Sequence, residues 1–280
     1  MTARDIIVDG VRVHVREAGE GPALVMLHGL GATGANWDAT AAAFADRWRV
    51  IVPDLPGHGR SAKPDAPYTV DFFAGIIRSL GRTLGIPEAI VMGNSLGGLV
   101  AIELALGYPG WTRGLVLAAP ATGFPAVFGL AGRALGAAVR PGLLRTFLPL
   151  FHDRSFFDPT LAASRERRAL LEERLADEDF PGFARAVARS LEAVLGGGRP
   201  PLEELRQPTL LVWGREDRLV PLGRSTRLVR ELPQARLAVL DRCGHVPMVE
   251  QPIAFNRAVA EFLPCVDAAP RPRRAAGGAS

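Results

Sequence analysis

Gly93-Asn94-Ser95-Leu96-Gly97-Gly98 is the stretch of this 280-residue chain that most narrowly defines its fold. The apolar run Ala89–Met92 precedes it, and helical periodicity begins at Leu96, so the motif occupies a strand-to-helix turn. In that setting G-x-S-x-G presents a nucleophilic serine. The flanking glycines avoid clashes at a sharp turn, and the first amides of the following helix favour negative charge. The motif predicts that Ser95 is a nucleophile.

Other short apolar runs recur along the chain without the alternation of half-exposed strands, and helical-period stretches separate most of them. Asp9-Gly10 adds an N-terminal hairpin between residues 6–8 and 11–15. This order predicts an α/β fold with a mostly parallel sheet and helices on both faces. The expected strands are Ala23–Leu27, Val50–Val52, Ala89–Met92, Leu115–Ala118, Leu210–Trp213 and Leu237–Leu240, and the expected helices are Trp37–Ala45, Val70–Leu84, Leu96–Leu106, Leu222–Leu232 and Pro252–Leu263.

The interval between Leu117 and Leu210 interrupts this rhythm, because it contains helical sequence and no good strand. We expect a core formed by residues 1–119 and 201–265, with a helical cap over residues 120–200. Glycines 196–198 and prolines 200–201 indicate a hinge at the end of the cap. Residues 266–280, rich in Ala, Pro, Arg and Gly, are expected to be a disordered tail.

The net charge of +4 does not indicate a nucleic-acid partner. Three arginines of the expected tail, set against Asp267, supply half of that charge. The remaining arginines are scattered among acidic residues, without a basic stripe interleaved with aromatic residues. We therefore expect no nucleic acid among the partners.

Two cysteines, Cys243 and Cys265, are too few for a disulfide framework and are expected to be reduced thiols. The first ten residues show no targeting signal. The longest uncharged run, 114–132, contains Pro120 and Pro125 and does not predict a membrane span. A cytoplasmic protein is expected.

A nucleophilic serine needs a general base and an acid that orients the base. His245 follows the expected strand Leu237–Leu240, at the sheet edge where Ser95 also lies, and is the predicted base. Asp217 follows strand Leu210–Trp213 and is the predicted acid, with Glu216 and Asp241 as alternatives. The other four histidines are His14, His28, His58 and His152.

An oxyanion hole completes this arrangement. One amide is expected from Leu96, the residue after the nucleophile, and the other from Leu30 in the glycine-rich loop His28–Gly31. His28 itself is expected to have a structural role. Asn94 either orders the turn or contacts substrate, and the sequence leaves both readings open.

Together these motifs resemble the α/β-hydrolase fold superfamily, from about Ile6 to Leu263. Asp54–Ser61 is similar to its D-x-x-G-x-G-x-S loop, and Trp213–Asp217 and Gly244-His245 followed by Glu250-Gln-Pro252 match its acid and histidine motifs. The resemblance implies an eight-stranded sheet, a cap domain and a Ser95–His245–Asp217 triad, with no cofactor and no metal. Relatives that open epoxides or displace halide have an aspartate at the nucleophile, so Ser95 argues against those reactions.

The first functional reading is an esterase- or lipase-like serine hydrolase that cleaves an apolar ester through an acyl-enzyme intermediate. The expected partner is a small apolar ester or ketone. The first half of the cap is strongly apolar and either lines a substrate pocket or only seals the cap onto the sheet. Candidate substrate contacts are Asn94, Phe124, Phe128, Phe147 and Val246.

The main alternative is a hydrolase of carbon–carbon bonds in ring-cleavage products of aromatic degradation. That subfamily is similar in its G-N-S-x-G-G motif and cap size, and it commonly has a cap arginine and a tryptophan after the catalytic histidine. Arg165, Arg167 or Arg168 could supply the first, but Val246 occupies the second position. Lactone, thioester and perhydrolysis chemistry stay open on the same triad, as does a non-catalytic receptor for a small molecule. The sequence leaves the oligomeric state open.

Overall fold

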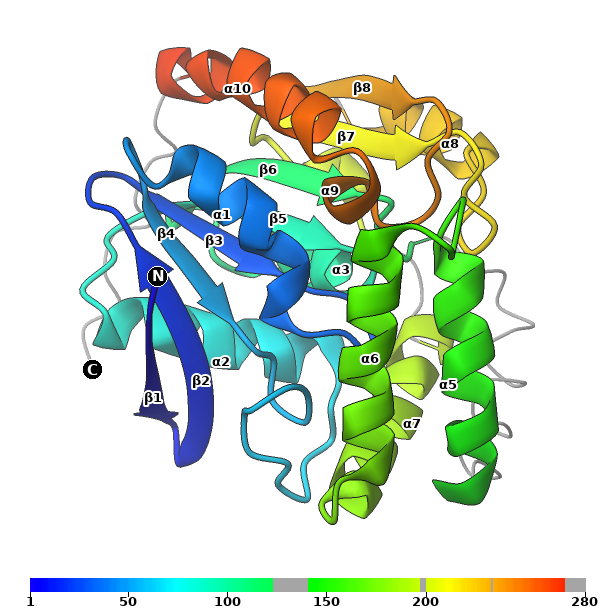
Figure 1. The fold of residues 1–280 in the computed structure, drawn as a ribbon. Coiled ribbons are helices and arrows are strands. Elements are labelled where there is room, and N and C mark those ends of the chain that lie inside the picture. Colours follow the sequence, from blue (N-terminus) through cyan, green and yellow to red (C-terminus); the bar gives the residue numbers. More distant parts are fainter. Residues whose placement is uncertain (123–140, 197–199, 233, 270–280) are drawn as a thin grey trace.

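The computed structural model describes residues 1–122, 141–196, 200–232 and 234–269. Eight strands form one sheet in the order β1-β2-β4-β3-β5-β6-β7-β8 (Figure 1). The pairs β1–β2 and β2–β4 are antiparallel and the other pairs are parallel, which confirms the predicted mostly parallel α/β architecture. The strands are Thr2–Val8, Val11–Ala18, Ala23–Leu27, Arg49–Pro53, Ala89–Asn94, Thr112–Ala118, Thr209–Gly214 and Ala235–Leu240 (β1 to β8).

Helices cover both faces of this sheet (Figure 1). One layer contains α2 (Val70–Thr83), α3 (Leu96–Gly107) and α8 (Gly223–Glu231). The other contains α1 (Asp38–Phe44), α9 (Pro247–Glu250) and α10 (Pro252–Ala268). Short 3₁₀ turns at Gly34–Trp37 and Leu202–Glu204 complete these layers.

Strand β3 shows why its apolar run lacks alternation. Val25 and Leu27 belong to the core cluster on the side of α2 and α3, whereas Leu24 and Met26 belong to the cluster on the side of α1 and α10. All four side chains are buried, because successive residues of a strand point to opposite faces and both faces here are covered.

A helical segment follows the sheet's middle strands, and we call its described part, residues 141–196, the insertion. It comprises α5 (Pro141–Ser155), α6 (Ala162–Ala176) and α7 (Phe180–Gly196), which lie together beside the carboxyl edge of the sheet (Figure 1). These helices bury a small apolar cluster of their own, made by Leu144, Leu148, Leu171, Phe180, Phe183, Ala184 and Val187. Among the residues that the structure describes, no helix is long and apolar enough to cross a membrane.

The last helix corrects the predicted start of the tail. Helix α10 includes Pro264 and continues to Ala268, so residues 266–268 are helical rather than disordered. Val266 is fully buried against Gly114 of β6, and its carbonyl accepts a hydrogen bond from Arg113 Nη2 at 2.9 Å. This packing holds the helix together beyond Pro264, where composition alone predicted a disordered tail from residue 266. Residues 270–280 lie outside the described residues.

Candidate active site

Ser95 lies at the turn between β5 and α3 in a backbone conformation that side chains rarely adopt, with φ 54° and ψ −114°. The two flanking glycines make this turn possible. A Cβ atom on Gly93 would lie 2.2 Å from the carbonyl oxygen of Gly97, and one on Gly97 would lie 2.3 Å from that of Leu27. Because both obstacles are backbone atoms, the turn excludes any side chain at these positions. The local sequence therefore enforces the strained conformation that presents Ser95 at the start of α3.

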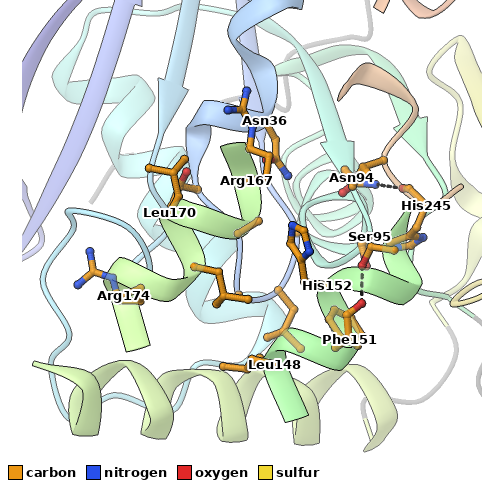
Figure 2. Close-up of a pocket in the computed structure, with 18 of the residues that line it drawn as sticks. Asn36, Asn94, Ser95, Leu148, Phe151, His152, Arg167, Leu170, Arg174 and His245 are labelled. Carbon is orange, nitrogen blue, oxygen red and sulfur yellow. Dashed lines mark hydrogen bonds between the residues drawn. The ribbon is translucent and has the colours of Figure 1, made fainter. Parts of the chain in front are cut away.

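His245 and Asp217 form a buried pair beyond the ends of β8 and β7. His245 Nδ1 lies 2.8 Å from Asp217 Oδ2. The other carboxylate oxygen, Oδ1, accepts hydrogen bonds from the amides of Leu219 (2.8 Å) and Val220 (2.9 Å). A carboxylate fixed in this way accepts a hydrogen bond from the protonated Nδ1, which leaves Nε2 as an acceptor. His245 and Ser95 lie next to each other at one end of a pocket (Figure 2), although no hydrogen bond joins His245 to Ser95 Oγ in the described part of the chain.

The two alternative acids are elsewhere. Glu216 Oε2 accepts a hydrogen bond from the amide of Cys243 at 3.0 Å, which ties together the loops after β7 and β8. Asp241 is exposed and pairs with Arg215. Neither of them contacts His245.

Asn94 orders the turn and also lines the pocket. Its Nδ2 donates hydrogen bonds to the carbonyl oxygens of Ala118 and His245, each at 3.0 Å, and Figure 2 shows the bond to His245. These bonds tie the ends of β5 and β6 to the histidine loop, which fixes the backbone of His245 relative to Ser95. The two readings that the sequence left open are therefore compatible.

The loop after β3 approaches Ser95 closely. A Cβ atom on Gly29 would lie 3.2 Å from Ser95 Cβ, and Leu30 lines the same pocket. His28 is buried beneath this loop, where its Nδ1 donates to Gly29 O (2.8 Å) and its Nε2 accepts from the Leu55 amide (2.9 Å). Burial lowers the pKa of His28, which keeps the imidazole neutral in this arrangement. Leu96 is the first residue of α3, where helical amides lack acceptors within the helix.

The pocket lies between the carboxyl edge of the sheet and the insertion. Figure 2 shows Ser95 and His245 at one end and Arg174 at the other, with Asn36, Arg167 and Leu170 between them. Its apolar lining comes from Leu148, Phe151, Phe156, Leu170, Leu171, Phe183 and Val246, and its polar lining includes Asn36, Asn94, His152, Arg167 and Arg174.

Phe147 corrects one predicted substrate contact. Its side chain is 44% exposed and does not line the pocket, whereas Leu148 and Phe151 do. Consecutive residues of an α-helix point about 100° apart, so Phe147 lies on the outer face of α5. The other two phenylalanines predicted to contact substrate, Phe124 and Phe128, lie outside the described residues.

Arg167 is the one of the three candidate arginines that lines the pocket. Its Nη2 donates to the carbonyl oxygen of Ala35 at 2.7 Å, and its Nε is buried without a partner among the described residues. Arg168 instead bonds Asp153 at 2.7 Å, and Arg165 bonds the carbonyl oxygen of Thr160 at 2.7 Å.

Asn36, His152 and Arg174 line the pocket but were not predicted from the sequence. A signal exists for Arg174, because Arg167, Leu170, Leu171 and Arg174 follow the spacing of one helix face. That spacing cannot say which neighbour the face meets. No three His, Cys, Asp or Glu side chains of the described ranges come together as metal ligands.

Comparison with known proteins gives three consistent findings. The model of the alpha/beta hydrolase family matches residues 24–258. The chain is 37% identical to a 2-hydroxy-6-oxononadienedioate/2-hydroxy-6-oxononatrienedioate hydrolase of Burkholderia vietnamiensis, over 92% of this chain and 94% of that protein. It is 32% identical to a 2-hydroxymuconate semialdehyde hydrolase of Pseudomonas sp. strain CF600, over 95% of each chain.

Among solved structures, that of a bacterial membrane phospholipase A superposes with a TM-score of 0.80 at 28% identity, covering 96% of this chain and 87% of that one. The family match spans most of the chain and includes the elements that carry Ser95, Asp217 and His245. The chain belongs to the alpha/beta hydrolase family.

Proposed function

We propose that this hydrolase cleaves a carbon–carbon bond next to a ketone in a carboxylated ring-cleavage product of aromatic degradation. The curated relatives favour this reaction over the ester hydrolysis that the sequence analysis placed first, because their names describe 2-hydroxy-6-oxo acids or a closely related semialdehyde. Such a molecule has a carboxylate at one end and a carbonyl several carbons away. The substrate site must therefore bind an anion at one end and activate a carbonyl at the other.

Arg167 is the observation that carries this proposal. With Arg174 it is one of two arginines that line a largely apolar pocket, and it lies away from Ser95, beyond His152 (Figure 2). The two Nη atoms of Arg174 donate to Asp177 and to the carbonyl oxygen of Gly59, respectively. The buried Nε of Arg167 has no hydrogen-bond partner among the described residues, and the carboxylates nearest to the guanidinium, those of Asp38 and Glu166, lie 3.8 Å away, so a donor is available to a substrate carboxylate. Leu148 and Phe151 also line the pocket and would contact the hydrocarbon chain.

The proposed reaction proceeds through an acyl-enzyme. Ser95 attacks the ketone carbon while His245 takes the Ser95 proton, and Asp217 stabilises the imidazolium. The amides of Leu30 and Leu96 stabilise the oxyanion, at about 2.7–4 kcal/mol per donor. When the tetrahedral intermediate collapses, the carbon–carbon bond breaks and its electron pair stays on the leaving carbon, which His245 protonates. His245 then activates water, which releases the acid from Ser95.

We also infer that the insertion acts as a cap. Eight of the residues that line the pocket lie on α5 or α6, and Phe183 adds a contact from α7. With the insertion in place the reacting carbonyl is shielded from bulk water, which strengthens each electrostatic interaction with it.

Ester hydrolysis is the second candidate, and Val246 favours it. This residue lines the pocket directly after His245, where the carbon–carbon hydrolases commonly have tryptophan. The smaller side chain leaves room for a wider acyl group, and the similar phospholipase A structure shows this fold with an ester substrate class.

The deciding experiment compares two substrates on the same protein. One substrate is 2-hydroxy-6-oxo-6-phenylhexa-2,4-dienoate, whose turnover is measured as the loss of its visible absorbance. We expect this turnover to exceed that of p-nitrophenyl esters from acetate to decanoate. Ser95→Ala should abolish both activities. Arg167→Gln should lower kcat/KM about 10- to 100-fold for the dienoate, from about 1.5–3 kcal/mol for a hydrogen bond to a charged group, and leave the neutral esters almost unchanged. Turnover of esters alone would establish the second candidate, and no turnover of either substrate by folded protein would favour a receptor.

A further inference from the structure

His152 is a second histidine in the pocket, and the proposed reaction does not use it. It lies on α5, and its side chain is only 12% exposed. In Figure 2 its ring lies between Arg167 and the end of the pocket that holds Ser95 and His245. Any molecule that reaches from Arg167 to Ser95 must pass this ring.

Asp153 determines which nitrogen of His152 carries the proton. His152 Nδ1 lies 3.3 Å from Asp153 Oδ1, and the same oxygen accepts a 2.7 Å hydrogen bond from Arg168 of α6. Hydrogen bonds from these two partners lower the pKa of Asp153, although desolvation by burial is the largest influence and raises it. An ionised carboxylate only accepts hydrogen bonds, so Nδ1 carries the proton.

The ring of His152 is neutral at physiological pH, because burial lowers its pKa against the opposing effects of Asp153 and Glu172. Nε2 is therefore an acceptor. That atom is buried and has no hydrogen-bond partner among the described residues. The ring also packs on Phe156, with the ring centroids 4.9 Å apart, so its orientation is constrained by both a carboxylate and an aromatic side chain.

We propose that His152 Nε2 accepts a hydrogen bond from a hydroxyl on the carbon next to the substrate carboxylate, and so selects 2-hydroxy acids. This inference rests on the proposed function, because Arg167 holds the carboxylate in it. The hydroxyl of a 2-hydroxy-6-oxo acid is adjacent to that carboxylate, and a carboxylate held by Arg167 would bring it to the part of the pocket that His152 lines. A hydroxyl donor matches a neutral imidazole acceptor, whereas a second anion would not.

The test measures binding without turnover, in protein that carries Ser95→Ala. Two ligands are titrated: 2-hydroxy-6-oxo-6-phenylhexa-2,4-dienoate and the same acid without the 2-hydroxyl. We expect Ser95→Ala to bind the hydroxylated acid roughly tenfold more tightly. Adding His152→Phe, which keeps a ring against Phe156 but removes the acceptor, should abolish that preference. Adding His152→Gln, whose side-chain oxygen can accept near the position of Nε2, should restore part of it.

Three results would overturn the inference while leaving the proposed function intact: equal binding of both acids to Ser95→Ala, a preference that persists with His152→Phe, or an equal loss of affinity for both acids in every His152 variant. The last result would indicate that His152 only packs. If His152→Phe fails to fold, His152→Leu, which also removes the acceptor, takes its place and should likewise abolish the preference. If neither acid binds and the wild type cleaves only esters, the proposed function fails, and this inference fails with it.

Discussion

The carboxyl edge of the sheet and the insertion contribute to one pocket in different ways. At the sheet edge, backbone geometry holds each candidate reactive group: Ser95 by its strained turn, and Asp217 by two amides. In the insertion, side chains reach the pocket because they lie on the inner face of their helix, as Leu148 does on α5 and Arg167 on α6. We infer that the sheet edge supplies the chemistry, and that the insertion supplies recognition and can change without disturbing it.

The two regions meet at the histidine loop. The His245 amide donates to the carbonyl oxygen of Ser155 at 2.7 Å, at the end of α5. A Cβ atom on Gly244 would lie 2.7 Å from the amide nitrogen of Phe157, so the loop packs tightly on the residues that connect α5 to α6. Variants that alter one region at a time can break or sharpen the comparison.

The largest effect is expected from the buried acid at the sheet edge. Asp217→Asn keeps the shape of the side chain but can donate to His245 Nδ1, which favours the wrong tautomer. We expect kcat to fall roughly 10⁴-fold. Asp241→Asn is the control, because Asp241 is an exposed carboxylate beyond the end of β8 that pairs with Arg215 rather than with His245. A loss with Asp241→Asn, or activity retained with Asp217→Asn, would contradict the assignment of the acid.

The second prediction compares how replacing a glycine by alanine changes the free energy of unfolding in each region. In Gly97→Ala the new methyl group would lie 2.3 Å from the carbonyl oxygen of Leu27, in the central strand β3. We expect the free energy of unfolding to fall by more than about 3 kcal/mol, since a backbone atom of the core cannot move aside.

Gly142 is the matched position in the insertion, near the start of α5, where a Cβ atom would meet nothing within 4 Å. Gly142→Ala should leave the unfolding free energy unchanged or raise it by less than about 1 kcal/mol, because alanine favours the helix. Urea denaturation of both variants tests the pair. A similar loss of unfolding free energy in Gly97→Ala and Gly142→Ala would show that the two regions tolerate an added methyl group equally.

Much of the sheet could be predicted from the sequence because local patterns determined it. Short apolar runs identified six of the strands, five of them buried on both faces and the sixth, β8, partly exposed at the edge of the sheet, and Asp9-Gly10 identified the hairpin. The motif around Ser95 could also be recognised from the sequence. Its glycines are required by nearby backbone, because a side chain on Gly93 would meet Gly97 and one on Gly97 would meet Leu27 in the adjacent strand β3. Ser95, Asp217 and His245 follow strand ends, so their meeting at one edge could be expected from topology alone.

The insertion and the last helix could not be read in this way. Leu148 faces the pocket and its neighbour Phe147 faces solvent, a difference set by the rotation of α5 against α6 and α7. Both are apolar, so composition does not separate them. Likewise, Val266 is helical because it packs on Gly114, which is distant in the sequence.

Glu250 joins the histidine loop to the insertion, and its replacement is expected to have the smallest of the three effects. Its Oε1 accepts hydrogen bonds from the amides of Gly244 (2.9 Å) and Val246 (3.4 Å), on either side of His245, and its Oε2 accepts from Phe157 at 2.7 Å. Burial raises the pKa of Glu250 to about 7 against the effect of these bonds.

Between pH 4.5 and about 7, Glu250 is therefore protonated in the folded protein and ionised in the unfolded chain, so folding takes up one proton in this range. The stability that this provides is fully present below pH 4.5 and is lost as the pH rises through 7. At 1.36 kcal/mol for each pKa unit, the loss is about 3 kcal/mol. Glu250→Gln resembles the protonated acid and does not titrate, so its unfolding free energy should rise relative to that of the wild type by about this amount between pH 4.5 and 8. Urea denaturation across that range measures the difference, with Glu204→Gln at an exposed site as the control. Parallel profiles would mean that Glu250 stays ionised throughout, and the junction between the histidine loop and the insertion would then not depend on pH.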